Sequence, residues 1–222
     1  MRILLVLLLV VDVATVHGNE PVDIGTRREL FTDSKLVQQI DGQLELRLHH
    51  PTPREIVMLH DEAWEGNNTT YHCVFKDGDL YRMFYVGRHS TLQKGQLNIG
   101  PSSFCYAESD DGIHWRKPHL GLCEFQGSRD NNIVMEPATA ARYGARLGAP
   151  AVFKDENPRA KPDARYKMFL SAKNPLGMLP MKSPDGIHWS PMSNKPVVTD
   201  GAFDSMNLAF WDVQRHMYRA YW

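Results

Sequence analysis

The chain repeats itself, and this repetition limits its possible folds more than any other feature. The pentapeptide Asp-Gly-Ile-His-Trp occurs twice, at residues 111–115 and 185–189. Upstream of each copy stands Val-Phe-Lys-Asp, at 74–77 and 152–155, which leads toward an apolar run that begins with tyrosine. Repeats that keep the same internal order indicate a fold built from several copies of one supersecondary unit.

Each copy has the composition of short antiparallel strands. Residues 74–85 place the turn Lys-Asp-Gly-Asp between two apolar runs, which is a strong hairpin signal. In the motif Ser-x-Asp-Gly-x-x-Trp we expect Asp111 and Asp185 to accept hydrogen bonds from turn amides, while the next glycine takes a positive φ. The 14 prolines and 16 glycines cut the chain into pieces too short for long helices. These features predict an all-β fold of four-stranded antiparallel blades, as in a β-propeller.

The number of repeats predicts an incomplete propeller. A third copy of the tyrosine element begins near residue 210, and the sequence ends inside it at Trp222. We therefore expect about two and a half blades, an N-terminal fragment of a propeller, with a small open sheet as the alternative. Before the first full copy, Arg28–Phe31 and Leu44–Leu48 are predicted as strands, the second by strict alternation. In a closed propeller such a segment completes the last blade.

The first 18 residues have the pattern of a secretory signal peptide. Arg2 precedes an unbroken apolar run over residues 3–11, and small residues follow. We expect residues 1–18 to be removed and residues 19–222 to form part of one soluble domain that is secreted or periplasmic. The alternative is an N-terminal membrane anchor. The formal net charge of -1 gives no electrostatic case for binding nucleic acid or an anionic membrane.

The three cysteines do not form a metal or redox motif. Cys73 lies in an apolar run and is predicted to be a small core residue. Cys105 and Cys123 are either a disulfide or two free thiols, and their spacing does not decide between these. His114 and His188 hold the same place in the two turns, which is more typical of turn neighbours than of a metal pair. We therefore expect neither a metal nor another cofactor.

Several motifs between Trp64 and Trp222 resemble the five-bladed β-propellers of the glycoside hydrolase superfamily that holds invertases, levansucrases and arabinanases, and most of all a secreted bacterial branch of it. The stretches that carry the resemblance are Arg-Glu-Leu-Phe-Thr-Asp at 28–33, Trp-Glu-Gly-Asn at 64–67, Phe-Lys-Asp-Gly at 75–78, Ala-Glu-Ser-Asp-Asp-Gly-Ile-His-Trp at 107–115, Asn-Asn-Ile-Val at 131–134 and Phe-Asp-Ser-Met-Asn at 203–207. The tryptophan-containing turn also resembles the Asp-box of sialidases, a blade-turn motif that has no catalytic role.

This resemblance implies a monomeric enzyme that hydrolyses the O-glycosidic bonds of a saccharide with a pair of carboxyl groups. In the resembling enzymes these groups lie where the innermost strands begin. The candidate catalytic residues are Glu65, Asp130 and Asp204, and the candidate substrate-binding residues are Asn68, Tyr71 and Asn207.

The positions where the family has carboxylates differ here. The blade-one nucleophile position falls near Tyr71, Ala151 replaces the aspartate of Ala-Pro-Asp-Val, and the blade-three position is near Asn207. We expect this chain by itself to be inactive as a glycosidase. Two other functions stay open, a carbohydrate-binding propeller without catalysis, of the lectin or sialidase-like Asp-box kind, and a scaffold for protein interactions.

Overall fold

The computed structural model describes residues 20–30 and 32–222, and it divides into the units Met1–Arg54 and Glu55–Trp222. The predicted signal peptide at residues 1–18 lies outside the described residues. Within the described part of the chain, no helix is both long enough and apolar enough to cross a membrane.

The described residues of the first unit contain turns and bends but no strand. The predicted strand at Leu44–Leu48 is therefore wrong, and so is the one at Arg28–Phe31 for its described residues. Alternating apolar residues form a strand only where a neighbouring strand pairs with their backbone and covers one face. Here Leu44, Leu46 and Leu48 are 76%, 64% and 79% exposed, so no surface covers them.

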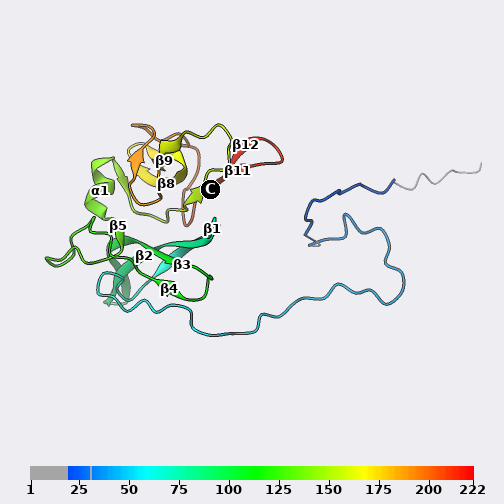
Figure 1. Ribbon diagram of the computed structural model, residues 1–222, viewed down its shortest axis with the longest axis horizontal. Helices are drawn as coiled ribbons and strands as arrows, with labels where there is room; N and C mark the ends of the chain where they lie inside the picture. The colour runs from blue at the N-terminus through cyan, green and yellow to red at the C-terminus, as the bar shows by residue number, and fades with distance from the viewer. Residues whose placement is uncertain (1–19, 31) are drawn as a thin grey trace, which may run out of the picture. The chain divides into compact units, whose positions relative to one another are not determined.

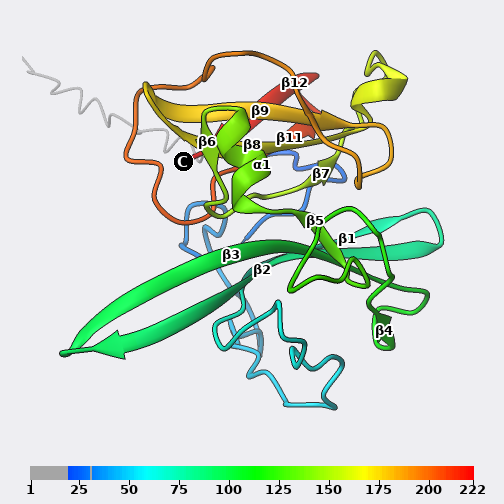
Figure 2. The same cartoon turned by 90° about the vertical axis from the view of Figure 1, so that its left-hand side faces the viewer.

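The first sheet of the second unit has antiparallel strands in the order β1-β2-β3-β4, and β5 also pairs with β3. The bounds are β1 Thr70–Asp77, β2 Leu80–Gln93, β3 Gln96–Ser109, β4 Trp115–Arg116 and β5 Ile133–Met135. The predicted Asp-Gly hairpin joins β1 to β2, where Asp77 pairs with Leu80. Figure 2 shows β2 and β3 running on beyond the other strands as a long twisted pair.

The second sheet has the strand order β10-β9-β8-β6, and β7 also pairs with β8. The remaining bounds are α1 Pro137–Arg142, β6 Ala145–Arg146, β7 Phe153–Lys154, the 3-10 helix η1 Pro162–Ala164, β8 Tyr166–Lys173, β9 Leu176–Ser183, β10 Ser190–Pro191, β11 Leu208–Asp212 and β12 Met217–Tyr221. Strands β11 and β12 form a separate antiparallel pair, and Figure 1 shows it next to the second sheet.

The described chain is thus nearly all-β with antiparallel sheets, which confirms the predicted class. Each larger sheet has five strands in four positions, because two short strands share one edge. Strands β4 and β5 both pair with β3, and strands β6 and β7 both pair with β8. The same order of hairpin, Asp-Gly turn and short strand occurs in both sheets, as the sequence repeat predicts.

The two turns that contain Asp-Gly-Ile-His-Trp have matching hydrogen bonds. The Oδ1 atom of Asp111 accepts hydrogen bonds from the backbone N–H groups of the second and third residues after it, both at 2.8 Å. The Oδ1 atom of Asp185 accepts the two equivalent bonds at the same distances. Gly112 and Gly186 have φ values of 80° and 84°. Asp111 and Asp185 are therefore turn formers, as predicted.

The main core lies between the two sheets. It joins Phe84, Phe104 and Tyr106 of the first sheet to Met168 and Leu179 of the second. Across the same boundary, the buried carboxylate of Asp77 accepts from the side chains of Arg82, Lys154 and Tyr166. The two sheets are therefore held together by apolar burial and by a buried ionic network.

A second apolar cluster covers the opposite face of the first sheet. It contains Met83, Tyr85, Cys105, Cys123 and Ile133. Because both faces of this sheet are covered, the middle of β2 is buried without alternation from Met83 to Gly87. Cys105 and Cys123 are both buried in this cluster, and both are free thiols.

Candidate functional site

The starts of three chain segments lie side by side in the second unit. The thiol of Cys73 in β1 donates to the carbonyl oxygen of Val152 at 3.0 Å. Two residues before Val152, Pro150 forms a parallel β-bridge with Asn207, which lies just before β11. These are the segments predicted to correspond to the innermost strands of a propeller. We call their meeting point, with the neighbouring end of β2, the inner-strand site.

Tyr71 is held at this site by an irregularity in β1. The pairing register of β1 with β2 shifts between Thr70 and Cys73, and Tyr71 within the shift has a φ of 58°. Bulges of this kind redirect a side chain, and a positive φ at a bulky residue is strained. The guanidinium carbon of Arg88 lies 5.1 Å from the centre of the Tyr71 ring. The bulge therefore gives the site an aromatic ring stacked with a cation.

Arg88 also joins the first sheet to the second segment. Its Nη2 atom donates to the carbonyl oxygen of Gly148 at 2.9 Å. Three buried polar atoms find no hydrogen-bond partner among the described residues: Thr70 Oγ1 at the start of β1, Arg88 Nε in the later half of β2 and Asn207 Oδ1 just before β11. A buried polar group without a partner costs about 1–3 kcal/mol. The inner-strand site therefore has unused donors and acceptors.

Glu65 lies behind this site with none of its surface exposed. Its carboxylate accepts from Lys117 Nζ at 2.7 Å, from the Tyr85 hydroxyl at 2.6 Å and from the Glu62 N–H at 3.0 Å. Burial alone would raise the pKa of Glu65, but these donors lower it below its ordinary value. The residue predicted as catalytic is thus a buried, ionised carboxylate that holds its own loop in place.

This loop positions the residues that face the site. After Glu65, the N–H groups of Asn67 and Asn68 both donate to the carbonyl oxygen of Arg88, at 3.0 and 3.1 Å. Gly66 allows this close approach, because a Cβ there would lie 2.1 Å from the same oxygen. The Asn68 side chain in turn donates to Ser90 Oγ at 2.8 Å. The predicted binding residues Asn68 and Tyr71 therefore both lie next to Arg88.

A pair of histidines extends the buried network toward solvent. His60 Nδ1 lies 3.2 Å from Glu65 Oε1, and its Nε2 atom lies 2.9 Å from His72 Nε2. Burial and the neighbouring His60 lower the pKa of His72. Across residues 20–30 and 32–222, no group of three side chains is arranged to hold a metal ion.

The other two predicted carboxylates lie on exposed loops. Asp130 pairs with His119 and accepts no bond from the three segments of the site. Asp204 precedes β11 between Phe203 and Ser205, whose φ values are 51° and 54°. The inner-strand site thus includes Asn68, Tyr71 and Asn207 and has Asp204 in an adjoining loop, whereas Asp130 lies elsewhere.

Sequence reasoning missed Arg88, Lys117 and His72. Arg88 and Lys117 act through partners 60 and 52 residues away in sequence, so local patterns gave no sign of them. His72 directly follows Tyr71, so the comparison that identified Tyr71 as a candidate could also have identified His72.

The fold and the site define a nearly all-β antiparallel protein with a polar site where three strand starts meet. No protein-family model and no curated protein sequence matches the chain. Among solved structures, it is similar to one from Parabacteroides distasonis assigned as a glycoside hydrolase, with a TM-score of 0.41 and 18% identity, over 66% of this chain and 39% of that one. It is also similar to a glycosyl hydrolase from Bacteroides ovatus, with a TM-score of 0.32 and 18% identity, over 68% of this chain and 60% of that one. The chain spans less than two thirds of either structure.

Proposed function

We propose that this chain is a secreted, glycoside hydrolase-like β-propeller protein that binds a saccharide at the inner-strand site. The observation that carries the proposal is the meeting of three strand starts, two of which Arg88 joins through its contacts with Tyr71 and with the Gly148 carbonyl. The repeated hairpins and turns support the propeller arrangement, because blades place the starts of their first strands around a common axis.

The side chains at this site suit a neutral, hydroxyl-rich ligand. Sugar hydroxyls both donate and accept hydrogen bonds, and the site offers a guanidinium and two carboxamides from Asn68 and Asn207. The Tyr71 ring adds an apolar surface with a polar tip, against which the C–H face of a sugar packs. A saccharide uses both kinds of contact at once.

Binding fits the described residues better than hydrolysis does. Hydrolysis by two carboxyl groups needs them roughly 5–10 Å apart on either side of the scissile bond. Glu65 is buried and paired with Lys117, and Tyr71, Ala151 and Asn207 occupy the positions where the resemblance leads one to expect carboxylates. The described site therefore lacks an exposed pair of acidic groups.

One observation favours hydrolysis as a second candidate. Asp204 is exposed and is flanked by two residues with positive φ, and strained backbone of this kind is concentrated at functional sites. In that case Asp204 serves as one carboxylate of the pair. Release of reducing sugar by the chain, abolished in Asp204→Asn, would support this candidate over binding alone.

The binding proposal is tested on a glycan array followed by titration calorimetry. We expect saturable binding of a neutral oligosaccharide, weakened roughly tenfold in Arg88→Ala because the cation and its hydrogen bonds are lost. Arg165→Ala is the matched control, since Arg165 also lies over a tyrosine ring, at 5.7 Å from the centre of Tyr166, but just before β8 and outside the inner-strand site. Equal loss in both variants, or no glycan bound by the unaltered chain, would contradict the proposal.

A further inference from the structure

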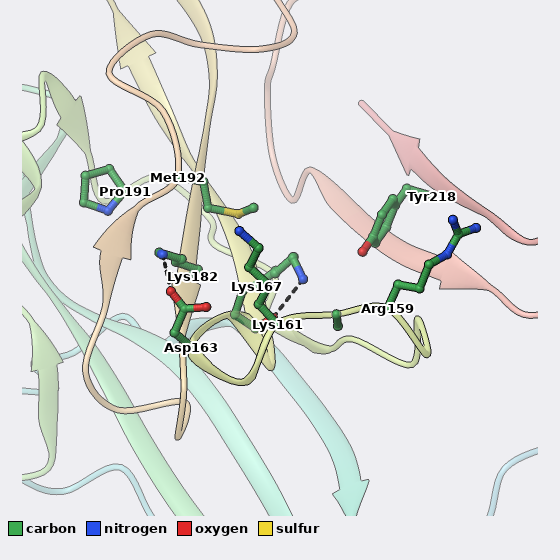
Figure 3. Close-up of a pocket in the computed structure, with 10 residues that line it drawn as sticks. Arg159, Lys161, Asp163, Lys167, Lys182, Pro191, Met192 and Tyr218 are labelled. Carbon is green, nitrogen blue, oxygen red and sulfur yellow. Dashed lines mark hydrogen bonds and ion pairs between the residues drawn. The ribbon is translucent and has the colours of Figure 1, made fainter.

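A separate pocket of about 360 Å³ opens beside the second sheet, away from the inner-strand site. Its walls come from the loop before η1, from β8 and β9, from the end of β10 and from β12. Figure 3 shows Lys161 and Lys167 in the middle, with Lys182 and Asp163 on one side and Tyr218 and Arg159 on the other.

The charged side chains that line this pocket are mostly cationic. They are Arg159, Lys161, Lys167 and Lys182, with Asp163 as the one carboxylate. The whole chain has 25 Lys and Arg residues and 26 Asp and Glu residues, so positive and negative charges are nearly equal in number overall. The excess of positive charge is therefore local to this pocket. Cations brought together in a concave surface attract anions more strongly than the same charges on a flat one.

Two of these cations have partners and two do not. Lys167 pairs with Asp155, whose carboxylate is fully buried, and also donates to the Ala164 carbonyl at 2.8 Å. Lys182 pairs with Asp163. Arg159 and Lys161 form no ion pair with any residue that the structure describes. The lining of the pocket therefore has two more positive charges than these two ion pairs neutralise.

An apolar wall completes the pocket. Pro191, Met192 and Tyr218 line it, and the last two are among the exposed large side chains of the protein. The Tyr218 hydroxyl donates to Asp155 at 2.7 Å, and Lys167 Nζ lies 5.7 Å from the centre of the Tyr218 ring. These contacts fix the ring next to the cations.

We propose that this pocket binds an acidic saccharide unit, with its sulfate ester or carboxylate on the cations and its sugar ring against Tyr218. That the ligand is a saccharide rests on the proposed function, whereas the preference for an oxyanion rests on the pocket alone. Arg159 and Lys161 provide the charges that form no ion pair among the described residues, and charge-assisted hydrogen bonds from such groups to oxyanions are among the stronger ones.

Asp163 serves as an exchangeable counter-ion in this pocket. Its side chain is 58% exposed, so solvent already reaches the ion pair with Lys182. An incoming oxyanion takes its place at Lys182, and the displaced carboxylate turns to water with little loss, because exposed ion pairs contribute only about 0–1 kcal/mol.

Titration of the whole chain followed by two-dimensional NMR and calorimetry tests this proposal. The probes are glucuronate, a sulfate ester of glucose, neutral glucose and inorganic sulfate. We expect one or both acidic sugars to bind saturably, more tightly than glucose or inorganic sulfate, and more weakly as salt is added. Arg159→Ala and Lys161→Ala should each weaken binding roughly threefold to fivefold, and the double variant roughly tenfold or more.

Lys173→Gln is the matched control, because this exposed lysine lies at the other end of β8 and should leave binding unchanged. Absence of saturable binding by every anionic probe overturns the proposal, as does binding that the double variant leaves intact. Inorganic sulfate binding as tightly as the sugar sulfate overturns the saccharide part. Arg88→Ala tests the inner-strand site with a neutral oligosaccharide, so the two proposals fail separately.

Discussion

Replacing Glu65 with glutamine removes a charge from the interior without changing the shape of the side chain. The carboxylate accepts from Lys117, from the Tyr85 hydroxyl and from the Glu62 N–H. The amide nitrogen of Gln is a donor, so it cannot accept from any of these groups. At least one donor that now faces Glu65 is therefore left without a partner in the Glu65→Gln variant.

The size of the effect follows from the exposure of Lys117. Removing one member of a buried ion pair costs about 3–5 kcal/mol, because the other charge stays buried and unpaired. The Lys117 side chain is 15% exposed and keeps a second carboxylate, that of Asp61, at 3.3 Å. We therefore expect the free energy of unfolding to fall by about 2–3 kcal/mol, which is less than the loss expected for an ion pair that is fully buried.

Urea unfolding followed by tryptophan fluorescence measures this change. Glu62→Gln is the control, because Glu62 forms no side-chain ion pair among the described residues and should change stability by less than about 0.5 kcal/mol. The double variant Glu65→Gln/Lys117→Met removes both charges and should regain part of the loss. A loss under about 0.5 kcal/mol in Glu65→Gln, or a double variant no more stable than the single one, would refute this reasoning.

Three further predictions concern groups elsewhere in the second unit. Burial alone would raise the pKa of Asp77, but hydrogen bonds and cations lower it from 3.8 to about 2. Its contribution to stability is therefore complete above pH 3.8 and lost as the pH falls toward about 2, so acid unfolding should be less steep in this range for Asp77→Asn than for the unaltered chain. Asp185→Ala should lower the unfolding free energy by about 1–2 kcal/mol in urea, because two turn amides lose their acceptor, and an unchanged midpoint would contradict this. Burial raises the pKa of the Cys105 thiol and raises that of Cys123 to about 11, so a disulfide reagent should label them only after unfolding; rapid labelling of the native chain would disprove their burial.

The parts of the fold that depend only on residues close together in the sequence were predictable. The hairpin after Asp77 and the turns at Asp111 and Asp185 are specified within a few residues, so their patterns identified them. The strand predicted at Leu44–Leu48 does not form, because an alternation of apolar and polar residues does not by itself provide a second strand to pair with.

The candidate site was predictable only where the strand starts could be compared with those of the resembling family. The family resemblance placed Tyr71 and Asn207 at equivalent strand starts, and the structure brings both of their segments against residues 150–152. The ionised state of Glu65 was not predictable, because its burial depends on Tyr85 and Lys117, which are 20 and 52 residues away. Long-range contacts of this kind determine whether a carboxylate faces a ligand or holds a loop.

The two Asp-Gly-Ile-His-Trp turns have a consequence for how such chains grow by gene duplication. The side-chain hydrogen bonds of Asp111 and Asp185 lie within their own turns, and each tryptophan donates back to the turn glycine, at 3.0 Å for Trp115 and 2.9 Å for Trp189. The backbone carbonyl of Asp185 also accepts from Arg82 of the first sheet, at 2.9 Å. A segment copied or recombined between such turns keeps the side-chain hydrogen bonds at its ends, because these bonds join residues of the same turn. The turn is therefore a position at which a repeated segment can be added or removed, and the one bond that must form again is the one from Arg82 to Asp185 between the two sheets.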